Sequence, residues 1–162
     1  MTTAPSASPD LSAVPDADLL RLDHQVCFSL HAASRAFGGF YRQALKDLGL
    51  TYSQYLVMLV LWEQGPQPVK AIGERLHLDS GTLSPLLKRL ETAGLVRRER
   101  SREDERSVLI DLTDEGTRLR ERALSVPRGV LAATGLSLDE VLGLQKVLGR
   151  LTTALGEAAD AY

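Results

Sequence analysis

The sequence of 162 residues predicts a mostly α-helical fold that carries one small β-hairpin. Over most of the chain, apolar residues recur at steps of three and four, which is the spacing of a buried helical face. Two short segments, 96–100 and 108–112, instead have strand character, and a polar turn joins them. Hydrophobic residues make up 44% of the chain, enough for a globular core rather than a disordered chain.

Residues 1–16 are rich in Pro, Ser, Ala and Thr and have almost no large apolar side chains. Such a segment cannot bury enough surface to offset its ordering entropy, so we expect a disordered tail. Large apolar residues then repeat from Leu19 to Leu45. They predict one long amphipathic helix, weakened at Gly38-Gly39 and ended by Gly49.

Three helices are expected in the middle of the chain. Thr51 and Gln54 have the spacing of a capping box, so the first should cover about 52–63 and be buried nearly all round. A short helix over 69–76 follows. Asp79 or Ser80 then caps a helix that ends near residue 92, with leucines 83, 86, 87 and 90 on its buried face.

Two further helices are expected after the hairpin. Thr113 should cap a helix over about 114–125, which Pro127 interrupts. Ser137 and Glu140 have the spacing of a second capping box, and they predict a last helix that runs to about residue 158.

Charge and composition exclude several classes of protein. The longest apolar run, 55–62, is about half of the roughly 20 residues that a membrane span needs, so no membrane association is expected and the location should be cytoplasmic. A net charge of -2 argues weakly against nucleic-acid binding. The single cysteine, Cys27, excludes an intramolecular disulfide and a four-cysteine metal site. We expect neither a metal nor a cofactor.

A short helix, a turn, a second helix and a hairpin with an arginine-rich tip are the order of a winged helix-turn-helix. In that fold the second helix enters the major groove of DNA, and the hairpin arginines can enter a minor groove. The alternative is that the charges form a solvated face of an ordinary helical bundle. The residues expected at DNA are Ser80, Thr82, Ser84, Lys88, Arg89, Arg102 and Arg106.

The segments YLVMLVLWEQ, DSGTLSPLLKRLE and EDERSV closely resemble the MarR family of regulators, and LDHQVCFSLHAASR extends the resemblance to the thiol. The match is to the organic hydroperoxide resistance regulator branch, in its one-cysteine type. It implies an intertwined helical homodimer that binds a palindromic double-stranded DNA operator. Residues 17–50 would then form a dimerisation and sensor region, 51–113 the DNA-binding domain and 114–162 the C-terminal dimerisation helices.

The resemblance also implies roles for single residues. Asp104 would orient Arg106 in the minor groove. The thiolate of Cys27 would be stabilised by Tyr52 and by Tyr41 of the other subunit, since an ideal helix places Tyr41 about 21 Å from the cysteine of its own chain. The family commonly has a tyrosine one turn after the cysteine, where this chain has His31. His31 either donates to the thiolate or is an ordinary surface residue.

The predicted function is a hydroperoxide-sensing repressor, with no catalytic residue. An organic hydroperoxide would convert Cys27 to a sulfenic acid. With no second cysteine in the chain, that acid would condense with a low-molecular-weight thiol, form a cyclic sulfenamide or be oxidised further. One alternative is a MarR-type repressor gated by a non-covalent ligand, with Cys27 in the core. Another is a thiol peroxidase, which would need a resolving thiol.

Overall fold

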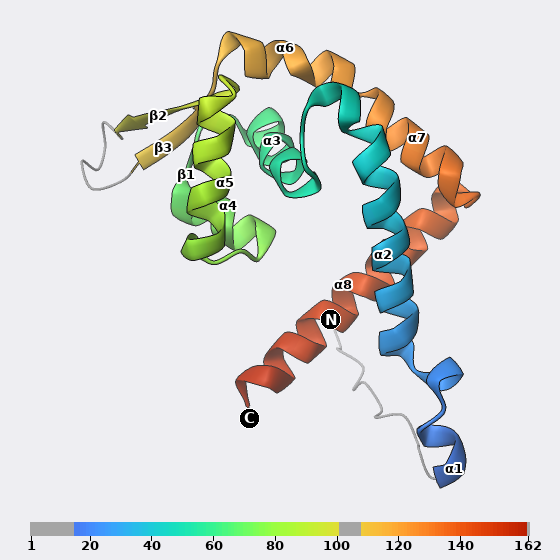
Figure 1. Ribbon diagram of the computed structural model, residues 1–162. Helices are drawn as coiled ribbons and strands as arrows, with labels where there is room; N and C mark the ends of the chain where they lie inside the picture. Colours follow the sequence, from blue (N-terminus) through green and yellow to red (C-terminus); the bar gives the residue numbers. More distant parts are fainter. Residues whose placement is uncertain (1–14, 101–107, 162) are drawn as a thin grey trace, which may run out of the picture. The chain divides into compact units, whose positions relative to one another are not determined.

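The computed structural model describes residues 15–100 and 108–161, except for the side chain of residue 17. Contacts divide the chain into two compact units, 1–39 and 40–162. The elements, coloured along the chain in Figure 1, are α1 (Asp16–Leu19), the 3-10 helix η2 (Leu22–His24), α2 (Val26–Ala44), the 3-10 helix η3 (Lys46–Leu48), α3 (Tyr52–Gln64), β1 (Gln67–Pro68), α4 (Val69–Leu76), α5 (Ser80–Thr92), β2 (Val96–Arg100), β3 (Val108–Leu112), α6 (Asp114–Ala123), α7 (Ser125–Thr134) and α8 (Leu138–Asp160).

The first unit corrects one prediction. The expected helix from Leu19 is broken into α1, η2 and α2, and α2 begins only at Val26. Gln25 is extended, and its side-chain amide donates to the carbonyl oxygens of Leu19 at 2.5 Å and Arg21 at 3.2 Å. These bonds satisfy carbonyl groups that a continuous helix would have used, so apolar spacing alone could not reveal the break.

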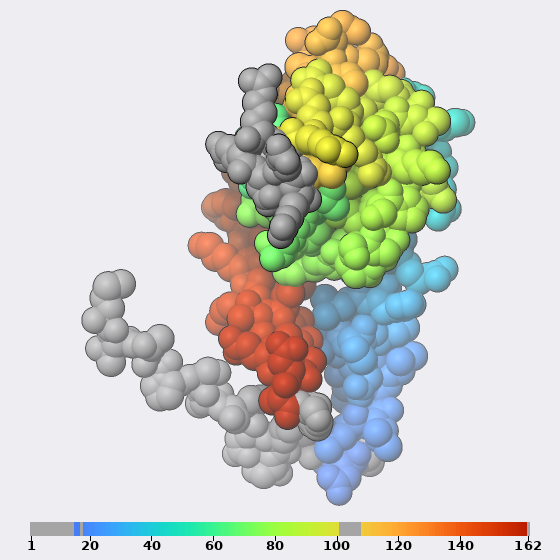
Figure 2. Space-filling view, turned by 90° about the vertical axis from the view of Figure 1, so that its left-hand side faces the viewer, coloured from blue at the N-terminus to red at the C-terminus, as the bar shows by residue number. Residues whose placement is uncertain are grey.

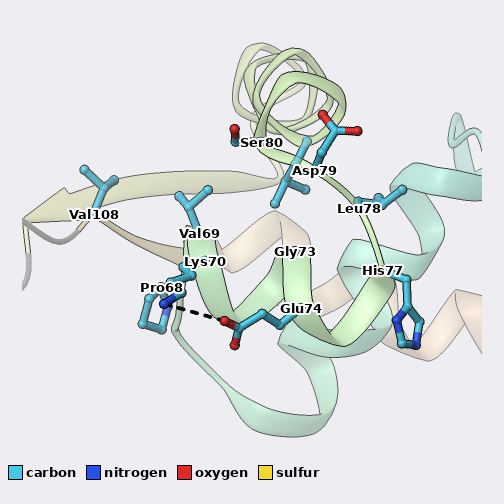
Figure 3. Close-up of a pocket in the computed structure, with 11 residues that line it drawn as sticks. Pro68, Val69, Lys70, Gly73, Glu74, His77, Leu78, Asp79, Ser80 and Val108 are labelled. Atoms are coloured by element: carbon cyan, nitrogen blue, oxygen red, sulfur yellow. Dashed lines mark ion pairs between the residues drawn. The ribbon is translucent and has the colours of Figure 1, made fainter. Parts of the chain in front are cut away.

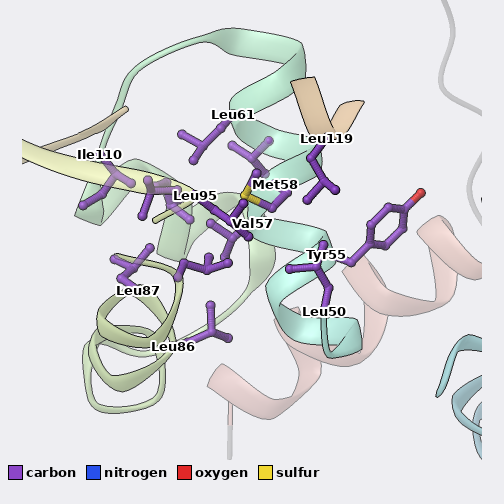
Figure 4. Close-up of a cluster of buried hydrophobic side chains, with 14 of the residues drawn as sticks. Leu50, Tyr55, Val57, Met58, Leu61, Leu86, Leu87, Leu95, Ile110 and Leu119 are labelled. Carbon is purple, nitrogen blue, oxygen red and sulfur yellow. The ribbon is translucent and has the colours of Figure 1, made fainter. Parts of the chain in front are cut away.

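Helix α3 is the centre of the second unit. It begins with the predicted capping box, since Thr51 Oγ accepts from the backbone N–H of Gln54 and the Gln54 side chain accepts from the N–H of Thr51. Upstream of it, Gly49 has the left-handed conformation that ends the preceding 3-10 turn. Around α3 lies an aliphatic core, part of which is drawn in Figure 4; its fully buried large side chains are Leu45, Met58, Leu61, Ile72, Leu83, Leu87, Leu90 and Ile110.

The predicted hairpin is confirmed, and the sheet has one more strand. Strands β2 and β3 pair antiparallel, with Val96 opposite Leu112 and Arg100 opposite Val108. The two-residue strand β1 pairs with the other edge of β3, which gives the order β1-β3-β2. Two residues that include a proline show no alternation, so β1 could not be predicted from the sequence.

The C-terminal part differs from the prediction at one proline. Thr113 caps α6, but that helix ends at Ala123 and α7 begins at Ser125. Pro127 therefore lies in the first turn of α7, where its missing N–H costs no hydrogen bond, and it does not interrupt a helix. The second capping box is confirmed at the start of α8. Among the described residues, no helix is long and apolar enough to cross a membrane.

Gly116 allows α6 to pack against the end of the hairpin. A Cβ atom there would lie 2.0 Å from the carbonyl oxygen of Leu95, and the carbonyl of Gly116 accepts from Nε1 of Trp62 at 2.9 Å. We expect Gly116→Ala to lower the free energy of unfolding by about 1–3 kcal/mol or more, because a backbone atom cannot move aside as a side chain does. Urea denaturation measures this.

The control is Glu115→Ala, which also places an alanine in α6 but at an exposed neighbour, where it removes only the surface ion pair with Arg118. Its effect should stay within about 0.5 kcal/mol. Equal unfolding free energies for the two variants would contradict the packing described for Gly116.

Candidate nucleic-acid interface and thiol site

Helix α5 turns its leucines inward and its polar residues outward. Leu83, Leu86, Leu87 and Leu90 are buried. All five residues predicted to contact DNA from this helix are exposed; they are Ser80, Thr82, Ser84, Lys88 and Arg89. The structure therefore brings these side chains onto the outer surface of one helix, and their contacts with DNA stay a prediction.

Asp79 begins this helix. Its Oδ1 accepts from the backbone N–H of Thr82 at 2.9 Å, and its Oδ2 accepts from the Thr82 hydroxyl at 3.0 Å. These two bonds, the backbone bond foremost, hold the pKa of Asp79 below its usual range. The carboxylate is therefore ionised at neutral pH.

A groove of about 870 Å³ lies between α4, the start of α5 and β3 (Figure 3). Lys70 and Glu74 form an ion pair at 3.7 Å on its α4 side. His77 lines it as well, and it is the one non-glycine residue with a positive φ in the part of the chain that the structure describes. Ser80 and Asp79 border the same groove, so the polar start of α5 faces open space.

A second, smaller hollow of about 200 Å³ lies between the start of α3 and the outer face of α5. Thr51 and Ser53 line it from the α3 side, and Thr82 and Arg89 line it from α5. The turn that carries Tyr52 is therefore next to residues predicted to contact DNA.

The arginines of the hairpin differ in how freely their charge is available. On β2, Arg97 pairs with Glu99 at 2.6 Å and with Asp111, and Arg98 pairs with Glu91 at 3.2 Å. Figure 2 shows α5 and β2, green-yellow to yellow, adjacent on one face.

On α5, Lys88 and Arg89 make no ion pair with any described residue. The predicted residues Arg102, Asp104 and Arg106 lie outside the described residues.

A cluster of tyrosines lies where the end of α2 meets α3. The ring centroids of Tyr41 and Tyr52 are 4.6 Å apart, and Tyr55 is 6.0 Å from Tyr41. Tyr55 also contacts Trp62, with centroids 6.3 Å apart. The structure thus brings together the two predicted tyrosines and adds Tyr55, which the sequence analysis missed although it lies one turn after Tyr52.

Burial is the first cause that raises the pKa of Tyr41 and of Tyr55, and the neighbouring tyrosines raise both further. A phenol with a raised pKa keeps its proton at neutral pH. Both side chains are therefore hydrogen-bond donors under physiological conditions, which is the form that stabilising a thiolate requires.

Cys27 is exposed and is the second residue of α2. His31, also exposed, follows it by one helical turn. Cys27 belongs to the first unit and the tyrosine cluster to the second, so the predicted approach of the tyrosines to the thiol stays a prediction. Among the described residues, no three His, Cys, Asp or Glu side chains gather closely enough to hold a metal ion.

Comparison with known sequences gives consistent matches. Residues 39–122 match the family described as Transcriptional regulator SarA/Rot. The organic hydroperoxide resistance transcriptional regulator of Bacillus subtilis is 46% identical over 138 residues, which are 85% of this chain and 94% of that protein.

Solved structures of AbfR are similar to this chain as well. The crystal structure of AbfR of Staphylococcus epidermidis is 41% identical and has a TM-score of 0.72; the match covers 87% of this chain and 97% of that one. Reduced AbfR bound to DNA is 42% identical over 86% of this chain and 96% of that one, with a TM-score of 0.71. Overoxidised AbfR bound to DNA is 40% identical over 87% and 99%, with a TM-score of 0.72.

The raised pKa values of Tyr41 and Tyr55 predict a loss of stability in alkali. In the unfolded chain a tyrosine ionises near pH 10, while the folded chain still holds both protons. The unfolded state then binds fewer protons, so the free energy of unfolding falls as pH rises above about 10. Urea denaturation of the wild type and of the variant Tyr41→Phe/Tyr55→Phe at pH 8 to 11 measures this.

The double variant should show a shallower fall above pH 10 and a parallel profile between pH 8 and 9, where neither state ionises a tyrosine. An equally steep fall in both proteins would contradict the raised pKa values.

Proposed function

This chain belongs to the MarR-type winged-helix transcriptional regulators, in the organic hydroperoxide resistance branch, and we propose that Cys27 sets its affinity for an operator. It is a redox-gated transcriptional repressor that binds double-stranded DNA while Cys27 is reduced. The observation that carries this is a single thiol in a chain whose relatives include a hydroperoxide resistance regulator and a regulator bound to DNA in reduced form. Its place of action is the cytoplasm, where the operator is.

The functional form is a homodimer built through 17–50 and 114–162. Helices α2 and α8, 19 and 23 residues long, contain no buried residue. Val26 and Leu155 are 65% and 60% exposed. Apolar helical surface of this extent needs cover, and a second copy of the chain supplies it with the symmetry that a palindromic operator requires.

The chemistry of the sensor begins at the Cys27 thiolate. Its sulfur attacks one peroxide oxygen, the O–O bond breaks, and the leaving alkoxide takes up a proton to become an alcohol. Cys27 is left as a sulfenic acid. The phenols of Tyr41 and Tyr52 stabilise the thiolate, one of them from the partner subunit, and His31 is a third candidate donor. Each subunit consumes one peroxide, so the protein acts as a sensor rather than as an enzyme.

Helix α3 connects this chemistry with DNA. Tyr52 begins α3, and the same turn borders Thr82 and Arg89 across the 200 Å³ hollow. A change at the tyrosines therefore reaches the outer face of α5 over one helical turn. In a dimer, a small rotation of α5 displaces both recognition helices at once, which lowers the affinity for the operator.

The releasing state is a mixed disulfide with a low-molecular-weight thiol. The thiol sulfur attacks the sulfenic sulfur of Cys27, a disulfide bond forms, and water leaves. Overoxidised AbfR is bound to DNA in its crystal structure, so overoxidation did not abolish DNA binding in that relative. The overoxidised forms of cysteine are sulfinic and sulfonic acids. A disulfide adduct is larger than these acids, and it changes the packing around Cys27 more.

Operator binding before and after oxidation tests the sensor. Reduced wild type and Cys27→Ser should bind the operator equally, because serine keeps the shape of the side chain. One equivalent of an organic hydroperoxide with a small thiol should lower the affinity of the wild type alone, and reductant should restore it. Fluorescence anisotropy with labelled operator measures each step.

Release of Cys27→Ser by the hydroperoxide would rule out the thiol mechanism. Release of both proteins by a non-covalent aromatic acid, unaffected by reductant, would instead support a ligand-gated repressor. Consumption of many peroxide equivalents per subunit would support a peroxidase.

Disruption of α8 tests the dimer. Val147 is 51% exposed, and Val147→Glu would place a charge in the proposed apolar interface, which costs several kcal/mol if it is left unpaired. Sedimentation equilibrium should show a shift from dimer to monomer, together with weaker operator binding. Gln145→Glu, an exposed polar position on the same helix, should leave the dimer unchanged. Dimers of equal stability in both variants would contradict an interface at Val147.

A further inference from the structure

The hydroxyl of Thr82 differs from those of Ser80 and Ser84, the other hydroxyl residues at the start of α5. It donates its only proton to Oδ2 of Asp79 at 3.0 Å, and the backbone N–H of Thr82 donates to Oδ1 at 2.9 Å. Ser80 and Ser84 make no side-chain hydrogen bond with any described residue. Their hydroxyls can rotate to donate or to accept, whereas the Thr82 hydroxyl is fixed by Asp79.

This pairing leaves only acceptors on the surface that Thr82 and Asp79 share. The hydroxyl oxygen of Thr82 keeps its lone pairs, and the ionised carboxylate has no proton to donate. Both residues are exposed. Gly81 lies between them, and a Cβ atom there would be 3.0 Å from Oδ1 of Asp79, so the absence of a side chain keeps the carboxylate accessible.

The edges of bases in the major groove differ in hydrogen-bond polarity. Adenine N6 and cytosine N4 are donors, whereas thymine O4 and guanine O6 and N7 are acceptors. A serine or threonine hydroxyl usually serves either kind because its proton can rotate. A hydroxyl whose proton is already donated to a carboxylate can only accept a further hydrogen bond.

Building on the proposed function, we propose that Asp79 is a specificity-determining residue that polarises Thr82, so that this pair reads an exocyclic amino group of adenine or cytosine in the operator. Asp79 thereby has two roles through the same two hydrogen bonds. It caps the helix, and it sets which kind of base edge Thr82 can contact. A thymine or guanine edge at this position would place its acceptor lone pairs against those of Thr82 and Asp79, and the two would repel.

The test is a change of base preference. Positions read by Thr82 are those at which Thr82→Val loses discrimination among the four base pairs of a selected operator. There, replacing adenine by purine, or cytosine by 2-pyrimidinone, removes the amino group alone and should weaken binding by reduced wild type about ten-fold.

Asp79→Asn is the decisive variant. Its amide oxygen can still accept from the N–H of Thr82, so the cap is kept, but its NH₂ group donates to the Thr82 hydroxyl. The hydroxyl proton is then free to point outward. Base preference at that position should move from adenine or cytosine towards thymine or guanine. Thermal unfolding should match that of the wild type.

Glu91→Gln is the matched control for charge. It removes one negative charge from the same helix at a position that pairs with Arg98, so it should change overall affinity and salt dependence without changing base preference. An Asp79→Asn preference identical to that of the wild type, or no loss on removal of the amino group, would overturn the inference. Absence of any operator binding by the reduced wild type would overturn the proposed function as well.

Discussion

The burial of α3 is the constraint on which the second unit depends. Its side chains Tyr55, Val57, Met58, Val60 and Leu61 are buried, so several neighbours must cover it. The leucine face of α5 and Ile110 of β3 share one aliphatic core with it, and Trp62 bonds to α6. Because that core is closely packed, none of these elements can shift alone. The polar face of α5 is outward because its apolar face is held by α3.

The start of α3 lies next to both the proposed thiolate donors and the proposed DNA-recognition helix α5. Tyr52 and Tyr55, one turn apart at the start of α3, contact Tyr41 near the end of α2. Thr51 and Ser53, in the same turn, border Thr82 and Arg89 of α5. The first turn of α3 therefore connects the proposed thiolate donors with the proposed DNA contacts. A short rigid path can transmit a small displacement, which a flexible one would absorb.

The placement of charges on α5 favours recognition of DNA bases over simple electrostatic attraction to the phosphate backbone. The chain has a net charge of -2, and Arg97 and Arg98 of β2 are paired with carboxylates. Lys88 and Arg89 supply cations on the outer face, while Asp79 keeps an anion at the start of the same helix. A carboxylate at the proposed DNA-binding surface weakens nonspecific binding. Here its hydrogen bonds cap the helix and fix the direction of the Thr82 hydroxyl.

Local patterns in the sequence determined most elements. The capping boxes at Thr51 and Ser137, the leucine face of α5 and both hairpin strands were all predicted correctly, because each depends on neighbours a few residues apart. Tertiary structure decided the rest. The break before Val26, the strand β1 and the place of Tyr55 depend on contacts between distant residues or on a single side-chain amide. The bond from Thr82 to Asp79 likewise depends on a rotamer, which residue spacing does not specify.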